Sequence, residues 1–361
     1  MPLVDATIIY DLIKIGGYLA VVLSICAYAV LAERRISAFI QDRLGPNRVG
    51  LPIWFRRDGT AVSLGNRWAI GQPLVDFLKF IFKEDVVPGH VNKLYYVLAP
   101  CITMIPALLV IAVIPFGPEV NGIKLVIADL NVGILWVFAI ASLGVYGIVI
   151  AGWASNSKYP FLGGIRSSAQ MISYEISMGL SVIPVIMHLG GFTTNGLSLS
   201  ELIRFQVENA WLIVYPWMWL PFLVYLISAF AETNRLPFDL PESETELVAG
   251  YHTEYSSMKF ALFFLAEYSN MVTQSALMVT MFFGGWSFPG VPSATTSIGW
   301  GFVAVGIFLV KVLAFLFLYI WVRWTLPRFR YDQLMHLGWK VLLPLALANI
   351  LIVAGALAAW D

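Results

Sequence analysis

Six carboxylates gather in one polar stretch of the chain, residues 232–259, between two long apolar segments. They are Glu232, Asp239, Glu242, Glu244, Glu246 and Glu254, and the same stretch holds two cations, Arg235 and Lys259, and one histidine, His252. Carboxylates this close repel one another, so some must share protons, attract cations from elsewhere or face water. Two interpretations are open: a solvated connector between membrane segments, or part of a path for protons in which His252 is a pH-responsive group.

Three further ionisable residues, Glu175, Glu267 and Lys311, lie inside apolar segments. A charge at the bilayer centre costs about 2.5 to 3.5 kcal/mol, and protonating a glutamate at pH 7 costs roughly 3.7 kcal/mol. Because the two costs are similar, a membrane glutamate near water and a cation is poised between charged and neutral, as a proton carrier must be. The alternative for each glutamate is a structural hydrogen bond between helices. Lys311 either pairs with a carboxylate or packs along the bundle with its ammonium toward the interface.

The elements that must position these groups are membrane helices. Of 361 residues, 59% are hydrophobic and 12% charged, against about 25% charged in soluble domains. One span needs about 20 apolar residues. Windows of that length predict an all-α polytopic membrane protein, a single transmembrane domain over residues 1–361, with eight transmembrane helices at about 12–32, 94–115, 132–153, 169–189, 212–231, 260–283, 299–322 and 339–359.

The cysteines and glycines limit the cofactors that this chain can hold. Cys26 and Cys101 stand alone in apolar segments, so neither an iron–sulfur site nor a zinc site is predicted. No phosphate-binding glycine motif occurs at a strand-to-helix turn. We therefore expect no metal in this chain, and any redox cofactor belongs to partner chains.

Basic residues predict the orientation. Lys and Arg are concentrated in the connections after the first, third, fifth and seventh predicted helices. Because basic connections stay in the cytoplasm, both termini are expected outside it and residues 232–259 inside. Acidic residues precede the first helix and no small-residue cleavage pattern follows it, so it is expected to be retained rather than removed as a signal.

The first cytoplasmic connection, residues 33–93, is longer than a tether requires. Its segment QPLVDFLKFIFKED predicts an amphipathic helix, with charged residues at Asp76, Lys79 and Lys83 and apolar ones at Leu74, Phe77, Leu78 and Ile81. Such a helix lies in the membrane interface. It is either a surface anchor or the edge of a wide, partly apolar vestibule.

Several long strings resemble one family. They are ERRISAFIQDRLGPNRVG, QPLVDFLKFIFKED, GWASNSKYPFLGGIRSSAQMISYE, AETNRLPFDLPESETELVAGYHTEYSSMKFALFF and LPRFRYDQLM. In sequence and order they are similar to the NuoH-type (mitochondrial subunit one) membrane subunit of respiratory complex I, the proton-pumping NADH:quinone oxidoreductase. The resemblance covers nearly the whole chain.

The resemblance implies a subunit at the junction of the membrane and peripheral arms, whose loops and helices enclose a chamber for the quinone tail. It implies that the partners are other complex I subunits of both the membrane arm and the peripheral arm, and that FMN and iron–sulfur clusters belong only to partner subunits. It also implies that quinone and membrane lipid are bound, that no nucleic acid is bound, and that the location is the bacterial inner membrane. The chamber or entrance residues that it implies are Arg34, Arg35, Arg48, Asp76, Phe77, Lys79, Phe80 and Arg323. The proton-path residues that it implies are Glu175, Glu232, Asp239, Glu242, Glu244, Glu246, Glu254 and Glu267.

These implications lead to a mechanistic hypothesis. Reduction of the quinone takes up two protons and creates transient negative charge beside the chamber. That charge changes the proton affinity of the acidic stretch and sends a protonation change into the membrane arm.

Two departures from the family pattern bear on these expectations. Residues 53–69 form a longer insertion than the family leads us to expect, with Arg56, Arg57 and Arg67, and are expected to remodel the entrance or to contact a peripheral subunit. The third predicted helix has Ser142 where some relatives have a glutamate, so fewer acidic steps are expected there.

Two other functions compete with this one. A stand-alone secondary transporter would have an internal repeat and broken helices meeting at the membrane midplane, and the sequence shows neither clearly. An anchor subunit in a related hydrogenase or ferredoxin-fed complex would share the fold, and only the partner subunits distinguish it.

Overall fold

The computed structural model describes residues 2–55, 61–64, 68–190, 197–288, 294–295 and 297–360, and within them the chain is mostly helical. Eight helices are long: α1 Pro2–Ile40, α3 Lys93–Leu109, α4 Gly133–Ala154, α5 Lys158–His188, α7 Trp219–Glu232, α9 Ser257–Phe282, α10 Ile298–Thr325 and α12 Leu343–Trp360. Shorter helices are α2 Gln72–Phe82, α6 Leu199–Glu208, α8 Glu244–Leu247 and α11 Tyr331–His336, with a π-helical segment, Leu337–Leu342, joining α11 to α12.

Short strands accompany the helices. β1 (Leu51–Phe55) and β2 (Ala61–Leu64) form an antiparallel pair. β3 (Glu119–Val120) and β4 (Ala294–Thr295) form a parallel pair. Both pairings are small, so the described part of the chain belongs to the predicted helical class.

Within the described residues, six segments are long and apolar enough to cross a membrane: residues 10–40, 93–113, 133–154, 158–188, 298–325 and 331–359. The multi-pass character that the composition predicts is therefore confirmed. Of the two remaining long helices, α7 belongs to a shorter apolar segment, residues 216–232. The other, α9, has 26 residues but carries serine, threonine, asparagine and glutamine through its second half.

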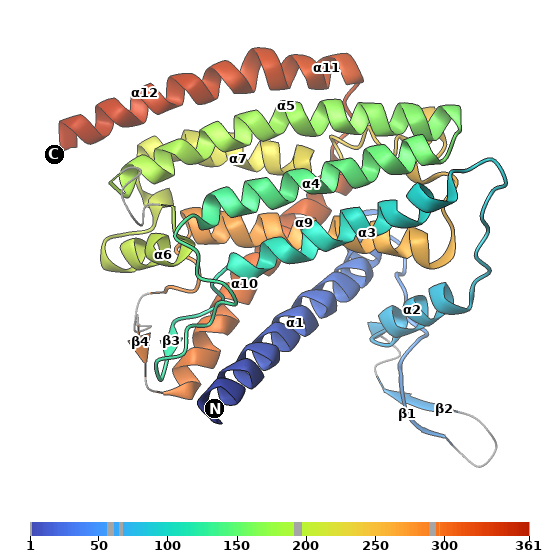
Figure 1. Ribbon diagram of the computed structural model, residues 1–361, viewed down its shortest axis with the longest axis horizontal. Coiled ribbons are helices and arrows are strands. Elements are labelled where there is room, and N and C mark those ends of the chain that lie inside the picture. Colours follow the sequence, from blue (N-terminus) through green and yellow to red (C-terminus); the bar gives the residue numbers. More distant parts are fainter. Residues whose placement is uncertain are drawn as a thin grey trace.

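The long helices lie side by side in a layered bundle, with α1 and α10 crossing the others at an angle (Figure 1). Both chain termini lie toward one end of the bundle, together with α6, β3 and β4. The opposite end holds α2, the start of α9 and the connection between α7 and α9. The acidic stretch and the termini are thus at opposite ends, as the predicted topology requires.

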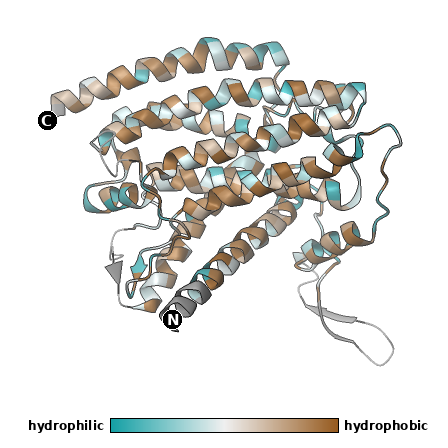
Figure 2. Cartoon of the chain, viewed as in Figure 1, coloured by the Kyte–Doolittle hydropathy of each residue, from teal (hydrophilic) through white to brown (hydrophobic). Residues whose placement is uncertain are grey.

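Hydrophobic residues predominate along the long helices of the bundle (Figure 2). Ile172 on α5 is 54% exposed, Phe302 on α10 is 74% exposed and Leu351 on α12 is 75% exposed. Exposed apolar area on this scale does not occur on soluble monomers. These faces therefore suit contact with lipid or with other membrane subunits.

Glycine residues allow backbones to pack closely at two places in the bundle. A Cβ on Gly147 of α4 would lie 2.1 Å from Thr103 Oγ1 of α3, so these helices meet at backbone distance. A Cβ on Gly163 of α5 would lie 2.7 Å from the backbone nitrogen of Tyr251. The acidic stretch therefore rests directly on the first turns of α5, and these turns extend the helix 11 residues before the apolar window predicted to begin at 169.

Candidate functional site

The connection between α7 and α9 folds back into the end of the bundle. The Gln170 amide of α5 donates hydrogen bonds to the carbonyls of Ala231, at 2.8 Å, and Phe238, at 2.7 Å. Arg235 is 2% exposed and Asp239 is 6% exposed. This half of the acidic stretch is therefore packed inside the protein rather than solvated.

Arg235 lies at the centre of a buried charge cluster. Its guanidinium forms ion pairs with Glu267 of α9, at 2.7 Å, and with Glu33 of α1, at 3.3 Å. The ring of Tyr268 lies 4.4 Å from the guanidinium carbon, within the range of a cation–π contact. A buried arginine needs such compensation, because an unpaired charge at this depth costs several kcal/mol.

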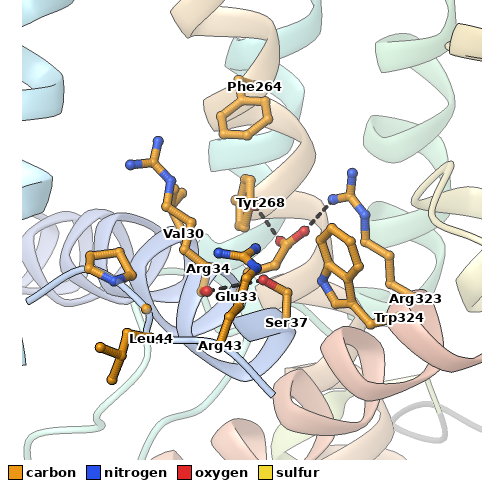
Figure 3. A pocket seen from close by; sticks show the side chains of 12 residues that line it. Val30, Glu33, Arg34, Ser37, Arg43, Leu44, Phe264, Tyr268, Arg323 and Trp324 are labelled. Atoms are coloured by element: carbon orange, nitrogen blue, oxygen red, sulfur yellow. Dashed lines mark hydrogen bonds and ion pairs between the residues drawn. The ribbon is translucent and has the colours of Figure 1, made fainter. Parts of the chain in front are cut away.

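Glu33 is the functional candidate that sequence reasoning missed. Its carboxylate pairs with Arg323 of α10 at 2.6 Å and accepts a hydrogen bond from the Tyr268 hydroxyl, and Figure 3 shows it between these two side chains. A signal was present in the sequence. Val22, Cys26, Ala29 and Glu33 recur at spacings of four, three and four, which place them on one face of α1, and each is at most 7% exposed.

A cavity of about 490 Å³ lies beside this cluster (Figure 3). We call it the charged cavity; its lining residues are Val30, Glu33, Arg34, Ser37, Arg43, Leu44, Gly45, Pro46, Phe264, Tyr268, Arg323 and Trp324. Its charged lining residues are one acid, Glu33, and three basic residues, Arg34, Arg43 and Arg323. Such a lining suits a polar or anionic headgroup.

A second cavity, of about 280 Å³, lies between α1, α2 and α9. Apart from Arg34, Gln72, Asp76 and Tyr268 its lining is apolar, and we call it the apolar cavity. Val30, Arg34, Phe264 and Tyr268 line both cavities, so the two adjoin. An apolar space bounded by α1, α2 and α9 therefore lies directly beside the charged cavity.

The structure brings five of the predicted entrance residues to these cavities and places three elsewhere. Those lining a cavity are Arg34, Asp76, Phe77, Phe80 and Arg323. Arg34 also pairs with Asp76 at 2.9 Å, joining α1 to α2.

The remaining three lie apart from both cavities. Arg35 donates to the carbonyl of Pro46 at 3.1 Å and lies 4.8 Å from the ring centre of Trp68. Arg48 and Lys79 are exposed. The three arginines of the insertion, Arg56, Arg57 and Arg67, lie outside the described residues, so the role expected for them stays a prediction.

The rest of the acidic stretch forms a second group of ion pairs. Arg328 pairs with Asp239 at 2.8 Å, His252 lies 3.4 Å from Glu242, and Arg166 pairs with Glu246 at 2.6 Å. Tyr96 donates to the backbone carbonyl of Glu254 at 2.6 Å. Glu244 begins α8, and its side chain lies outside the described residues.

Two of these carboxyls have opposite shifts in proton affinity. Burial and the neighbouring Glu242 raise the pKa of Asp239 to about 7, although Arg328 opposes the rise. Burial also acts to raise the pKa of Glu242, but His252 and the nearby arginines outweigh it and hold that pKa below its usual value. Neighbouring acids in one site thus differ in the pH at which they release protons, as acid–base machinery requires.

Glu232 and Glu175 form a third polar region, deeper in the bundle. Glu232 is 4% exposed, and its Oε2 atom has no hydrogen-bond partner among the residues that the structure describes. Glu175 and the hydroxyls of Tyr225 and Tyr319 lie close enough to interact with it electrostatically. The structure therefore brings together the two glutamates that sequence reasoning selected from different helices.

Within the described residues Lys311 forms no ion pair with a carboxylate, and its ammonium reaches backbone carbonyls instead. Its ammonium donates to the carbonyls of Phe283, Gly285 and Ser287 at 2.7 to 3.0 Å and lies 4.2 Å from the ring centre of Trp211. These three carbonyls lie just beyond the last residue of α9, so they have no hydrogen-bond partner within that helix. Lys311 therefore closes the end of α9.

Comparisons with known proteins show the family of the chain. A family model described as NADH dehydrogenase matches residues 13–354. The chain is 48% identical to an NADH-quinone oxidoreductase subunit of Koribacter versatilis, over 95% of both chains. It is 49% identical to NADH-quinone oxidoreductase subunits of Geobacter sulfurreducens, over 95% of both chains, and of Geobacter metallireducens, over 98% of both. The chain therefore belongs to the NADH dehydrogenase family, whose matching members include these NADH-quinone oxidoreductase subunits.

Proposed function

We propose that this chain is the membrane-arm subunit of a proton-translocating NADH:quinone oxidoreductase and forms the membrane side of its quinone chamber. The observation that carries the proposal is the junction of the two cavities through Val30, Arg34, Phe264 and Tyr268. The apolar cavity fits an isoprenoid tail, and the charged cavity suits the polar headgroup. The names of the relatives, all NADH-quinone oxidoreductase subunits, support the same assignment.

The chemistry needs protons from the protein and electrons from partner subunits. A quinone that accepts two electrons must gain two protons to become the neutral quinol. Before protonation its negative charge would be attracted to Arg34, Arg43 and Arg323 in the charged cavity. That attraction competes with Glu33 for Arg323, because both anions would contact the same guanidinium.

Competition for these arginines connects the quinone to the acidic residues. When Arg323 turns toward the quinone, Glu33 depends more strongly on Arg235, which also pairs with Glu267. A shift of Arg235 changes the field at Asp239 and Glu242, whose proton affinities already depend on it. Glu232, the last residue of α7, lies three residues before Arg235 in the chain and close enough to Glu175 to interact with it electrostatically.

The topology completes the proposal. Helices α1, α3, α4, α5, α7, α9, α10 and α12 would be the eight spans, with α2 in the membrane interface. The basic connections and the acidic stretch would face the cytoplasm of a bacterial inner membrane, and both termini the periplasm. Identifying the subunits that co-purify after mild detergent extraction tests the electron donor: a nucleotide-binding flavoprotein supports NADH, whereas its replacement by hydrogenase or ferredoxin-binding chains favours the related complexes.

The quinone route is tested by filling the apolar cavity. Ala261 of α9 lines this cavity, and Ala261→Trp would add a bulky ring to a space of about 280 Å³. The variant should raise KM for a long-tailed quinone by roughly tenfold, the factor that corresponds to about 1.4 kcal/mol, and leave KM for a short-tailed analogue nearly unchanged. The matched control is Ala348→Trp on an exposed position of α12. Wild-type kinetics with the long-tailed quinone in Ala261→Trp would rule out this route.

A further inference from the structure

The first residue of α9, Ser257, has an unusual backbone. Its φ is +53°, a left-handed conformation that side-chain-bearing residues rarely adopt. It is also 5% exposed. A residue keeps such a conformation only when its surroundings hold it there, so the contacts of Ser257 must stabilise it.

The hydroxyl of Ser257 reaches the end of another helix. It lies 2.9 Å from the carbonyl oxygen of Phe80 and 3.0 Å from that of Lys83, so one proton serves either acceptor. The last four carbonyls of a helix have no partner within it, and Phe80 belongs to the last turn of α2. Ser257 therefore ties the C-terminal end of α2 to the start of α9.

Neighbouring residues strengthen this connection. The Ser256 hydroxyl accepts from the backbone N–H of Val86 at 2.9 Å, and Lys259 forms an ion pair with Asp85. We call Ser256, Ser257 and Lys259, with the backbone of residues 80–86 and the Asp85 carboxylate, the α2–α9 latch. Of its three α9-side residues, Ser257 is the most deeply buried.

The latch has a counterpart nearer the middle of α2. There Asp76 pairs with Arg34 of α1 at 2.9 Å and accepts a hydrogen bond from Gln72. Between these attachments, Phe77 and Phe80 face the apolar cavity. Polar contacts thus hold α2 to α1 through Asp76 and to α9 at its C-terminal end, and apolar residues between them form one wall of the cavity.

We propose that Ser257 is a positioning residue that sets the width of the apolar cavity by holding α2 against α9. The proposal rests on the function proposed above, in which the quinone tail passes through this cavity. Ser257 is not among the residues that line either cavity. Its effect is therefore on passage of the tail and not on chemistry at the headgroup.

The experiment compares Ser257→Ala with Ser257→Gly in the intact complex. Both remove the hydroxyl, but glycine adopts a positive φ without strain, so the pair separates the hydrogen bond from the backbone conformation. Both variants should raise KM for a long-tailed quinone about fivefold, roughly the equilibrium factor of one lost hydrogen bond. They should leave kcat, and KM for a short-tailed analogue, unchanged. The matched control is Ser142→Ala, whose hydroxyl bonds within its own helix.

Hydrogen exchange gives a readout independent of catalysis. The Lys83 N–H, which bonds to the carbonyl of Lys79, should exchange about fivefold faster in both variants, by the same lost hydrogen bond, whereas amides in the middle of α9 should not change. Wild-type behaviour of Ser257→Gly beside an impaired Ser257→Ala would overturn the proposal, because backbone conformation alone would then explain the defect. Equal changes in KM for both quinones would also overturn it.

The outcomes also separate the latch from the quinone route. If the Ser257 variants are normal while Ala261→Trp raises KM for the long-tailed quinone, the latch proposal fails and the route stands. If neither substitution affects the long-tailed quinone, both proposals fail.

Discussion

Glu33→Gln tests the buried charge cluster. In the native cluster, the carboxyl groups of Glu33 and Glu267 face the two guanidinium groups of Arg235 and Arg323. The substitution keeps the size of the side chain and leaves one carboxylate facing two guanidinium groups. Arg235, at 2% exposure, cannot reach water to compensate.

The expected cost follows from the contacts that remain. Removing one partner of a buried ion pair costs about 3 to 5 kcal/mol when the other charge is left uncompensated. Here Arg235 keeps Glu267 at 2.7 Å, and Arg323 is 23% exposed and can be hydrated. We therefore expect about 2 to 3 kcal/mol, which corresponds to roughly 30- to 150-fold faster thermal inactivation if the cluster breaks in the rate-limiting step.

The assay is the time course of activity loss of the assembled complex at a fixed elevated temperature. The control is Asp332→Asn, because Asp332 pairs with Arg330 on the surface, where their side chains are 67% and 76% exposed, and such pairs contribute about 0 to 1 kcal/mol. If Glu33→Gln loses activity no faster than Asp332→Asn, the cluster does not stabilise this end of the bundle and the reasoning is refuted.

Two further predictions concern packing and pH. Gly147→Ala would place a Cβ 2.1 Å from Thr103 Oγ1, whereas the Cβ of Gly144→Ala would meet nothing within 4 Å. Because overpacking costs about 1 to 3 kcal/mol, only Gly147→Ala should reduce the amount of assembled complex on native gels. Equal amounts of complex for the two variants would contradict this prediction. Burial raises the pKa of Asp239 from 3.8 to about 7, so the folded state binds this proton more tightly and stability falls as pH rises through that range. Asp239→Asn should therefore flatten the change in thermal inactivation between about pH 4 and 7; an unchanged profile would assign the titration elsewhere.

The apolar windows in the sequence anticipated the long helices because the membrane leaves a long apolar segment few choices. Without water, every backbone N–H and carbonyl must be satisfied within the segment, which favours a helix. The helix α2 was anticipated for a different reason. Charged and apolar residues over 73–83 fall on opposite faces of a helix, and the structure has a helix at Gln72–Phe82. The helix boundaries were less predictable. The apolar window for α5 began at residue 169, but the helix begins at Lys158, and the acidic stretch packs on its first turns.

The candidate site was only partly predictable. Sequence reasoning selected Glu232, Glu267 and Arg323 because charged residues stand out in apolar surroundings or in matching motifs, but it treated Arg235 merely as a minority cation among acids. Glu33 went unselected beside Arg34 and Arg35, although its spacing from Cys26 places it on the buried face of α1. Two partners of Glu33, Arg235 and Tyr268, lie 202 and 235 residues away in the chain.

The amino-acid sequence by itself determined that the chain crosses a membrane repeatedly and where most of its long helices lie, and it predicted ionisable groups within apolar segments. The tertiary structure alone decided which of these groups meet, that Arg235 joins two carboxylates from different helices, and that Ser257 ties α2 to α9. The physical reason is that helix formation in lipid depends on local composition. Ion pairs and cavities depend instead on how separate helices are rotated and packed, which no local pattern specifies.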